Sequence, residues 1–367
     1  MAVLLAGMLP LVLLFSMRGM VGTDTAVYLQ IIQLISEVGT AVSGFAQTPL
    51  IGWGEFTFLS KFLLHFNASP TLIIVIIGFL TTIILIWAAQ NSFQSRWIFF
   101  ICIVPIFYLD MTMNGLRYGL AFALTSYAIA LSYRGRWLVS GFVQGAAVFM
   151  HSSALILLFV TWVMTGNKKQ RKHLLFTTIL VGALFTVSPS PSPSPSPSPS
   201  VSPSVSPSVS PSADDYWENK VTTYSNISAP SMLSGLAPLV LSLATLFIFY
   251  GLSKLPKNLL TRYQVVGLFV LVGAAFLMAK FSYAGLRVQY AILFAILVNA
   301  QFKPEFELLM GNQKFRLGLL LVGLAGLVFF LRGIAGSEGL APSPFLPYEI
   351  NENVISYFSA IKLGVLN

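Results

Sequence analysis

The chain has 367 residues, of which 56% are hydrophobic and only 9% are charged, and its formal net charge is +9. Apolar runs near the length of a bilayer crossing recur along it, which indicates a multi-pass membrane protein. The 21 Lys and Arg residues are spread over short segments between these runs, so the charge argues against a nucleic-acid partner. The chain has a single cysteine, Cys102, which excludes an intramolecular disulfide and a multi-cysteine metal site. With only three histidines besides, we expect neither a metal nor a cofactor.

The apolar runs predict an all-α, polytopic membrane bundle of about 10–12 transmembrane helices. No basic segment precedes the first run, so we expect an uncleaved first span, with a cleaved signal peptide as the alternative. The expected spans are residues 2–16, 71–89, 97–109, 118–133, 137–150, 152–165, 174–187, 232–252, 264–279, 288–302 and 317–331.

A Ser-Pro repeat divides the chain into three parts. We expect an N-terminal membrane bundle at 1–187 with an outer amphipathic segment at 22–69, an outer low-complexity loop at 188–231, and a C-terminal membrane bundle at 232–367. Alternating prolines at 188–212 prevent regular helix and sheet hydrogen bonding and favour an extended polyproline II chain. The repeat is therefore predicted to be a spacer.

Most of the basic residues fall in connections that can share one side of the membrane, which the positive-inside rule assigns to the cytoplasm. These residues are Arg96, Arg134, Arg136, the basic residues of "KKQRK" at 168–172, Lys254, Lys257, Arg262, Lys303, Lys314 and Arg316. Residues 137–166 must then cross and return, or dip and return, with His151 at the apex.

Four ionisable residues lie at one predicted depth: Asp110, Arg117, His151 and Arg287. A rise of about 1.5 Å per residue from the nearest basic connection places each of them about 21 to 25 Å from the cytoplasmic boundary. In a hydrocarbon core of about 30 Å they form one layer near the outer boundary. Ionisable groups at such a depth usually face a bundle interior or a watery pocket. The alternative is that both arginines only extend toward lipid phosphates.

The neighbours of the two arginines are also polar. Asn114 and Arg117 are three residues apart, and Tyr283, Arg287 and Tyr290 follow each other at helical spacing, so each set is expected on one helix face. Guanidinium forks suit phosphate oxygens, and tyrosines offer hydrogen bonds and stacking surfaces to sugars. The pattern predicts an outward-opening site for a lipid-linked pyrophosphate.

His151, in "FMHSSAL", can take a proton from an attacking hydroxyl or hold a substrate oxygen, because imidazole titrates near neutral pH. A hydrogen bond between helices is the structural alternative. A hydrolase pairing with Ser152 or Ser153 is disfavoured, because adjacent residues on a helix do not face each other.

After the first span, "MRGMVGTDTAVYLQII" brings Arg18, Asp24 and Tyr28 ahead of an amphipathic stretch, with Asp24 and Tyr28 one turn apart. Capping of the next helix by Thr23 or Asp24 is the alternative interpretation. Glu55 lies in "WGEFTFLSKFLLHF", which is expected on the membrane surface.

Five segments in this order, "RGMVGTDTAVY", "GEFTFLSKFL", "NGLRYGLAFAL", "FMHSSAL" and "RVQYAIL", make the chain resemble the EpsG-like group of Wzy-type polysaccharide polymerases. Relatives often have a glutamine where this chain has Tyr118, and the Ser-Pro repeat is not part of the family pattern. The positions that match are Arg18, Gly22, Asp24 and Tyr28, then Glu55, then Asn114 and Arg117, then His151, and finally Arg287 and Tyr290.

The resemblance implies a glycosyltransferase of GT-C-like architecture in the bacterial inner membrane, with its active site toward the periplasm or outer face. It would join undecaprenyl-diphosphate-linked oligosaccharide repeat units into O-antigen, capsule or exopolysaccharide, without a metal, and with a chain-length-regulating copolymerase as a partner. Arg117 and Arg287 would stabilise the leaving diphosphate, and His151, then Asp24, are the first candidates for the base. Asp110 and Tyr283 join the remaining matched positions as expected substrate contacts.

Three other classes remain open: an O-antigen ligase that uses the same donor, a transporter or flippase of lipid-linked sugar, and, more distantly, a membrane acyltransferase that rests on His151. A nucleotide-sugar transferase is disfavoured, because no cytoplasmic segment is long enough for a globular nucleotide-binding domain.

Overall fold

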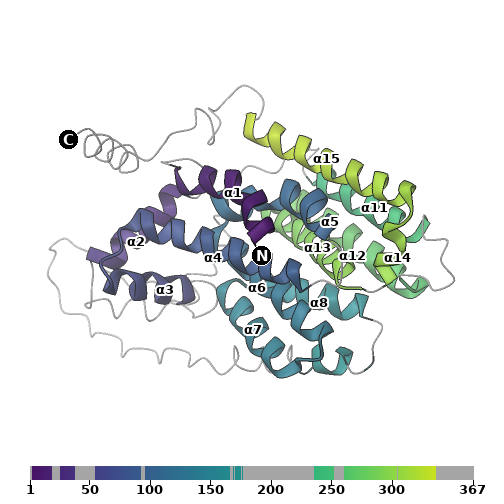
Figure 1. Cartoon of the computed structure of the whole chain (residues 1–367), viewed down its shortest axis with the longest axis horizontal. Coiled ribbons are helices and arrows are strands. Elements are labelled where there is room, and N and C mark those ends of the chain that lie inside the picture. Colours follow the sequence, from purple (N-terminus) through teal and green to yellow (C-terminus); the bar gives the residue numbers. More distant parts are fainter. Residues whose placement is uncertain are drawn as a thin grey trace, which may run out of the picture.

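The structure is a computed structural model, and all regular elements in its described part are helices (Figure 1). Three stretches there are long and apolar enough to cross a membrane: α4 (Pro70–Gln90), α12 (Arg262–Phe281) and Gln313–Arg332 within α15 (Gln313–Ala335). Several shorter apolar helices accompany them, so the predicted polytopic helical fold is confirmed. The described residues are 2–18, 25–37, 54–91, 96–165, 168, 170–174, 176, 235–251, 260–303 and 305–335.

Most expected spans coincide with a helix to within a few residues. The run at 174–187 lies almost wholly outside the described residues, as does the expected loop at 188–231. The remaining elements are α1 (Ala2–Ser16), α2 (Thr25–Glu37), α3 (Gly54–His65), α5 (Arg96–Ile98), η1 (Phe99–Tyr108), η2 (Asp110–Asn114), α6 (Leu116–Tyr133), α7 (Trp137–Met150), α8 (Ala154–Met164), α11 (Leu236–Gly251), α13 (Tyr283–Gln301) and α14 (Glu305–Met310).

Local sequence signals define where two of the long helices begin. Ser69 caps α4 by accepting a hydrogen bond from the backbone N–H of Leu72 at 3.3 Å, and Pro70 occupies the first turn, where no N–H is needed. Thr261 and Gln264 form a capping box at the start of α12, with each side chain bonded to the other residue's backbone N–H.

One prediction about the helices is wrong, because the chain breaks at Gly115. Residues 99–108 and 110–114 form π-helical turns, and the Gly115 N–H donates to the Asp110 carbonyl five residues earlier, at 2.9 Å. Gly115 then leaves helical geometry with φ −103 and ψ 60, and α6 begins at Leu116. Asn114 and Arg117 therefore do not lie on one face of a continuous helix.

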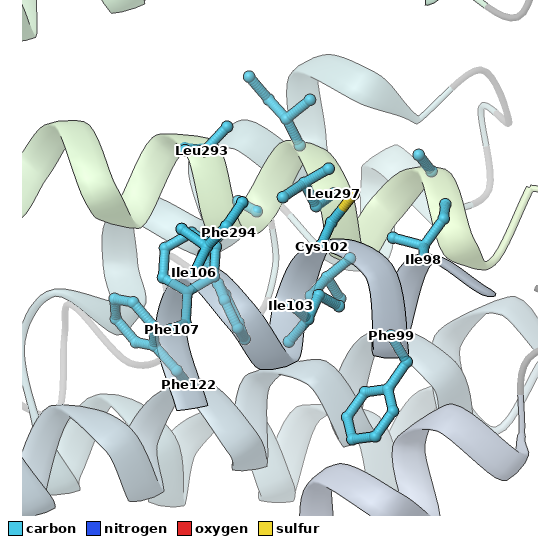
Figure 2. Packing of buried hydrophobic residues seen from close by; sticks show 14 of the residues in the cluster. Ile98, Phe99, Cys102, Ile103, Ile106, Phe107, Phe122, Leu293, Phe294 and Leu297 are labelled. Carbon is cyan, nitrogen blue, oxygen red and sulfur yellow. The ribbon is translucent and has the colours of Figure 1, made fainter. Parts of the chain in front are cut away.

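The core is built around α13, whose middle section is buried on all sides. Phe294 packs against Phe107 of η1 with ring centroids 5.1 Å apart and against Phe122 of α6 at 4.9 Å. Figure 2 shows these three rings together, with Cys102 beside Leu297 further along α13. A second cluster, which includes Tyr28, Phe56 and Leu120, joins α2 and α3 to α4 and α6.

The basic connections meet at one end of the bundle, here called the basic end. The Arg134 guanidinium donates to the Asn91 carbonyl at the end of α4, and Gln170 donates to Ser132 at the end of α6. Tyr133, at the end of α6, stacks on Phe302, which follows α13 and precedes Lys303. Helices α4, α6 and α13 therefore all finish at the basic end.

Helices α7 and α8 form a return that starts and finishes at the basic end. The Ser140 hydroxyl donates to the Ala128 carbonyl of α6, and the Asn299 amide of α13 donates to the Thr161 hydroxyl of α8. With about 1.5 Å of rise per residue, α7 and α8 are about 21 and 16 Å long, so the pair dips deeply and returns. His151 lies in the turn between them, at the end of the bundle away from the basic residues.

Candidate functional site

The break at Gly115 produces a hydrogen-bonded group of side chains. The Asn114 amide donates to Asp110 Oδ1 at 3.0 Å, and the Tyr118 hydroxyl donates to Asp110 Oδ2. Gly115 makes room for this pairing, since a Cβ there would lie 1.5 Å from the Tyr118 ring. Both carboxylate oxygens of Asp110 are thereby held by neighbours from η2 and α6.

The turn between α7 and α8 adds His151 to this group. Its ring meets the Tyr118 ring edge to face, with centroids 6.3 Å apart and planes at 72°. His151 Nδ1 accepts a hydrogen bond from the Ser153 backbone N–H at 3.1 Å, and the Ser153 hydroxyl lies 2.6 Å from the same nitrogen. We call Asp110, Asn114, Tyr118, His151 and Ser153 the polar cluster.

Two segments near the N-terminus also reach η2. Arg18, which is 2% exposed, donates from Nη1 to the Thr112 carbonyl at 2.7 Å. The Thr25 hydroxyl donates to the Met113 carbonyl at 3.4 Å. These two hydrogen bonds attach the end of α1 and the start of α2 to η2, the element that carries Asp110 and Asn114. Asp24 itself lies outside the described residues.

Arg117 and Arg287 lie at a similar level of the bundle. Helices α6 and α13 run in the same direction, because Phe122 in the first half of α6 meets Phe294 in the middle of α13, and Tyr133 meets Phe302 at their ends. Along the axes, Arg117 precedes Phe122 by about 7.5 Å and Arg287 precedes Phe294 by about 10.5 Å, so their levels differ by about 3 Å. Arg117 is only 8% exposed, in the first turn of α6.

The other expected site residues divide into three groups. Tyr28 is buried and packs on Phe56 at 5.1 Å, so its ring belongs to the core of the second cluster. Tyr290 is half-buried, and its ring meets Phe107 at 6.2 Å, on the same helix as Arg287. Glu55 and Tyr283 belong to α3 and α13, but their side chains lie outside the described part of the chain.

Sequence reasoning missed three contributors. Tyr118 was noted only as a departure from the family pattern, although the neighbouring "NG" break is the signal that could have drawn attention to it. Ser153 was considered only as a nucleophile, whereas its backbone N–H and hydroxyl both meet His151. The carbonyl of Thr112 has no sequence signal at all, because only the tertiary structure brings Arg18 to it.

This arrangement combines groups for three chemical tasks. Buried guanidinium groups can hold an anion such as a phosphate, a carboxylate held by Asn114 and Tyr118 can accept a proton, and an imidazole can donate or accept one. Among the described residues, no three His, Cys, Asp or Glu side chains come together as a metal site. These residues suit a reaction in which a hydroxyl attacks a carbon atom and a phosphate group leaves that carbon.

A family model described as "EpsG family" matches residues 1–350 of the chain. No curated protein and no solved structure matches the chain significantly.

Proposed function

Because the chain belongs to the EpsG family of Wzy-type polysaccharide polymerases, we propose that it joins undecaprenyl-diphosphate-linked oligosaccharide repeat units into a surface polysaccharide. The observation that carries the proposal is the position of buried Arg117 in the first turn of α6, next in sequence to Tyr118 of the polar cluster, at the end of the bundle away from the basic end. The positive-inside rule assigns the basic end to the cytoplasm, so this site would face the periplasm or the outer solution.

In the proposed reaction, the bond between the anomeric carbon of the donor sugar and its phosphate oxygen breaks. A hydroxyl oxygen on the acceptor unit bonds to that carbon, the hydroxyl proton passes to a base of the site, and undecaprenyl diphosphate leaves with the bonding electrons. The leaving group carries the developing charge, so Arg117 and Arg287 would contribute most by stabilising it. Asp110, which accepts a hydrogen bond from Tyr118, and His151, whose ring meets the Tyr118 ring, are the candidates to accept the proton.

The direct test is elongation by purified protein in lipid vesicles. We expect an undecaprenyl-diphosphate-linked repeat unit, given as both donor and acceptor, to be converted into a ladder of products that differ by one unit. Transfer only to a lipid A core acceptor would replace the proposal with a ligase. Movement of labelled lipid across the vesicle membrane without a new glycosidic bond would replace it with a transporter.

Tyr118 allows a sharper test of the polar cluster. In Tyr118→Phe the ring that contacts His151 is kept, while the hydroxyl that donates to Asp110 is lost. A hydrogen bond to a charged group is worth about 1.5–3 kcal/mol, so we expect the elongation kcat to fall at least about tenfold with little change in KM.

Tyr127→Phe is the matched control, because Tyr127 lies on the same helix but packs on Trp87 of α4. If Tyr118→Phe and the control have equal kcat values, the hydrogen bond from Tyr118 to Asp110 has no role in the reaction.

A further inference from the structure

Two basic segments that are far apart in sequence meet at the basic end, beside the start of α7. The ring of His173 stacks on the ring of Trp137, with centroids 4.9 Å apart and planes at 10°. Two residues earlier, Arg171 donates from Nε to the Thr165 carbonyl at 2.7 Å, directly after α8. The segment at 171–173 is therefore fastened to both α7 and the end of α8.

Three positively charged side chains surround the stacked rings. Arg136 directly precedes Trp137, and Lys172 directly precedes His173, so each segment places one cation next to the pair of rings. Lys168 is helical and lies one turn before Lys172, which puts the two lysines on one face. We call Arg136, Lys168 and Lys172 the cation group.

The charges of the cation group are not neutralised by the described part of the chain. All three side chains are exposed, and none makes a hydrogen bond or ion pair with another described residue. The sequence also has no Asp or Glu from residue 111 to residue 213. A negatively charged partner from outside the chain is the natural complement of such a group.

The helix next to the cation group has an exposed apolar face. Leu138 is 82% exposed and Phe142 is 80% exposed, one turn apart at the start of α7, and Phe149 further along the helix is exposed as well. Figure 1 shows α7 at the margin of the bundle. In a membrane protein, an exposed apolar face of this kind contacts the lipid chains. The cation group thus lies where the apolar face of α7 begins.

We propose that the cation group and the apolar face of α7 together bind an anionic phospholipid of the membrane leaflet at the basic end. The guanidinium of Arg136 and the ammonium groups of the two lysines hold the headgroup phosphate, and the acyl chains lie along Leu138 and Phe142. Trp137 lies between these two parts, at the level where tryptophan is enriched in membrane proteins. Basic groups between membrane helices suit phospholipid headgroups, and each Lys or Arg near the headgroups strengthens binding about fivefold. The proposal involves no chemical step and does not depend on the proposed function.

The site is tested by adding single lipids to the full-length protein in a neutral detergent and counting bound lipid by native mass spectrometry. Three cations at about fivefold each predict that phosphatidylglycerol binds about a hundredfold more tightly than phosphatidylcholine of the same chain length. Glycerol 3-phosphate, which has the phosphate without acyl chains, should bind far more weakly than phosphatidylglycerol. Equal affinities for the two lipids would overturn the proposal. If glycerol 3-phosphate binds as tightly as phosphatidylglycerol, the group binds a free phosphate and the lipid proposal fails.

The double variant Arg136→Gln/Lys172→Gln locates the site. It removes two of the three cations, so we expect the dissociation constant of phosphatidylglycerol to rise about 25-fold while that of phosphatidylcholine stays within about twofold. Both side chains are exposed, so the Tm without lipid should not change.

Lys314→Gln/Arg316→Gln is the matched control, because it removes the same charge from two exposed residues at the start of α15. We expect this control to keep the affinity for phosphatidylglycerol within about twofold. If both double variants lose affinity equally, the net charge of the chain and not the cation group governs lipid binding, and the proposal is wrong.

Discussion

Replacing Arg117 with alanine is expected to lower the rate of elongation about a hundredfold or more. Arg117 is 8% exposed in the first turn of α6, next to Tyr118 of the polar cluster, so its charge acts in a site with little water. Removing one preorganised group that stabilises a developing anion typically costs about 10²- to 10³-fold in kcat. Arg117→Lys keeps the charge but loses the planar fork, and we expect an intermediate loss. The initial rate of ladder formation is to be compared between the unaltered protein, Arg117→Ala and Arg117→Lys.

The control for Arg117 lies at the other end of the same helix. Arg134 is exposed and donates to the Asn91 carbonyl, so Arg134→Ala should leave elongation within about twofold of the unaltered protein. Adding Arg287→Ala to Arg117→Ala completes a double-mutant cycle. If both arginines hold one diphosphate, the two losses will not simply multiply. Near-normal activity of Arg117→Ala would place the donor elsewhere.

Gly119→Ala is expected to lower both thermal stability and activity, although it adds a single methyl group. A Cβ at Gly119 would lie 2.2 Å from the backbone carbonyl oxygen of Met111, and a backbone atom of η2 cannot rotate away as a side chain can. Overpacking of this kind costs about 1–3 kcal/mol. Because η2 carries Asp110 and Asn114, we also expect elongation to fall at least about tenfold. Tm and initial rates of the purified variant test both effects.

Gly273→Ala is the matched control for this substitution. Gly273 lies within α12, and a Cβ there meets no atom within 4 Å. We expect unchanged activity and a Tm that is equal or slightly higher, because alanine favours a helix over glycine by about 0.5–1 kcal/mol. If Gly119→Ala and Gly273→Ala behave alike, the close packing of η2 on α6 is not needed for the site.

The helical spans could be predicted because each is encoded locally. A run of apolar residues bounded by polar ones is expected to become a helix in a membrane, since the backbone must satisfy its hydrogen bonds internally. The run at 2–16 matches α1, and the run at 137–150 matches α7, with the same bounds. The return of the chain at His151 was also expected, because basic residues on both sides of it require the same membrane face.

The details of the site could not be predicted in this way. The spacing of Asn114 and Arg117 predicts a continuous helix with both residues on one face. The structure instead turns the chain at Gly115, so Asn114 and Tyr118 both reach Asp110 from two sides of the break. A π-helical turn changes which residues share a face, and no periodicity in this short segment reveals it.

By itself, the sequence determined the membrane setting, the helices, the family and the placement of the two arginines away from the basic connections, because hydropathy, charge and motif order are properties of the chain alone. Only the tertiary structure decided which groups meet: Arg18 with Thr112, Tyr118 with Asp110 and His151, and Ser153 with the imidazole. These contacts depend on side-chain directions and on backbone atoms freed at helix breaks. Both are set by how helices distant in sequence pack together, which no local pattern encodes.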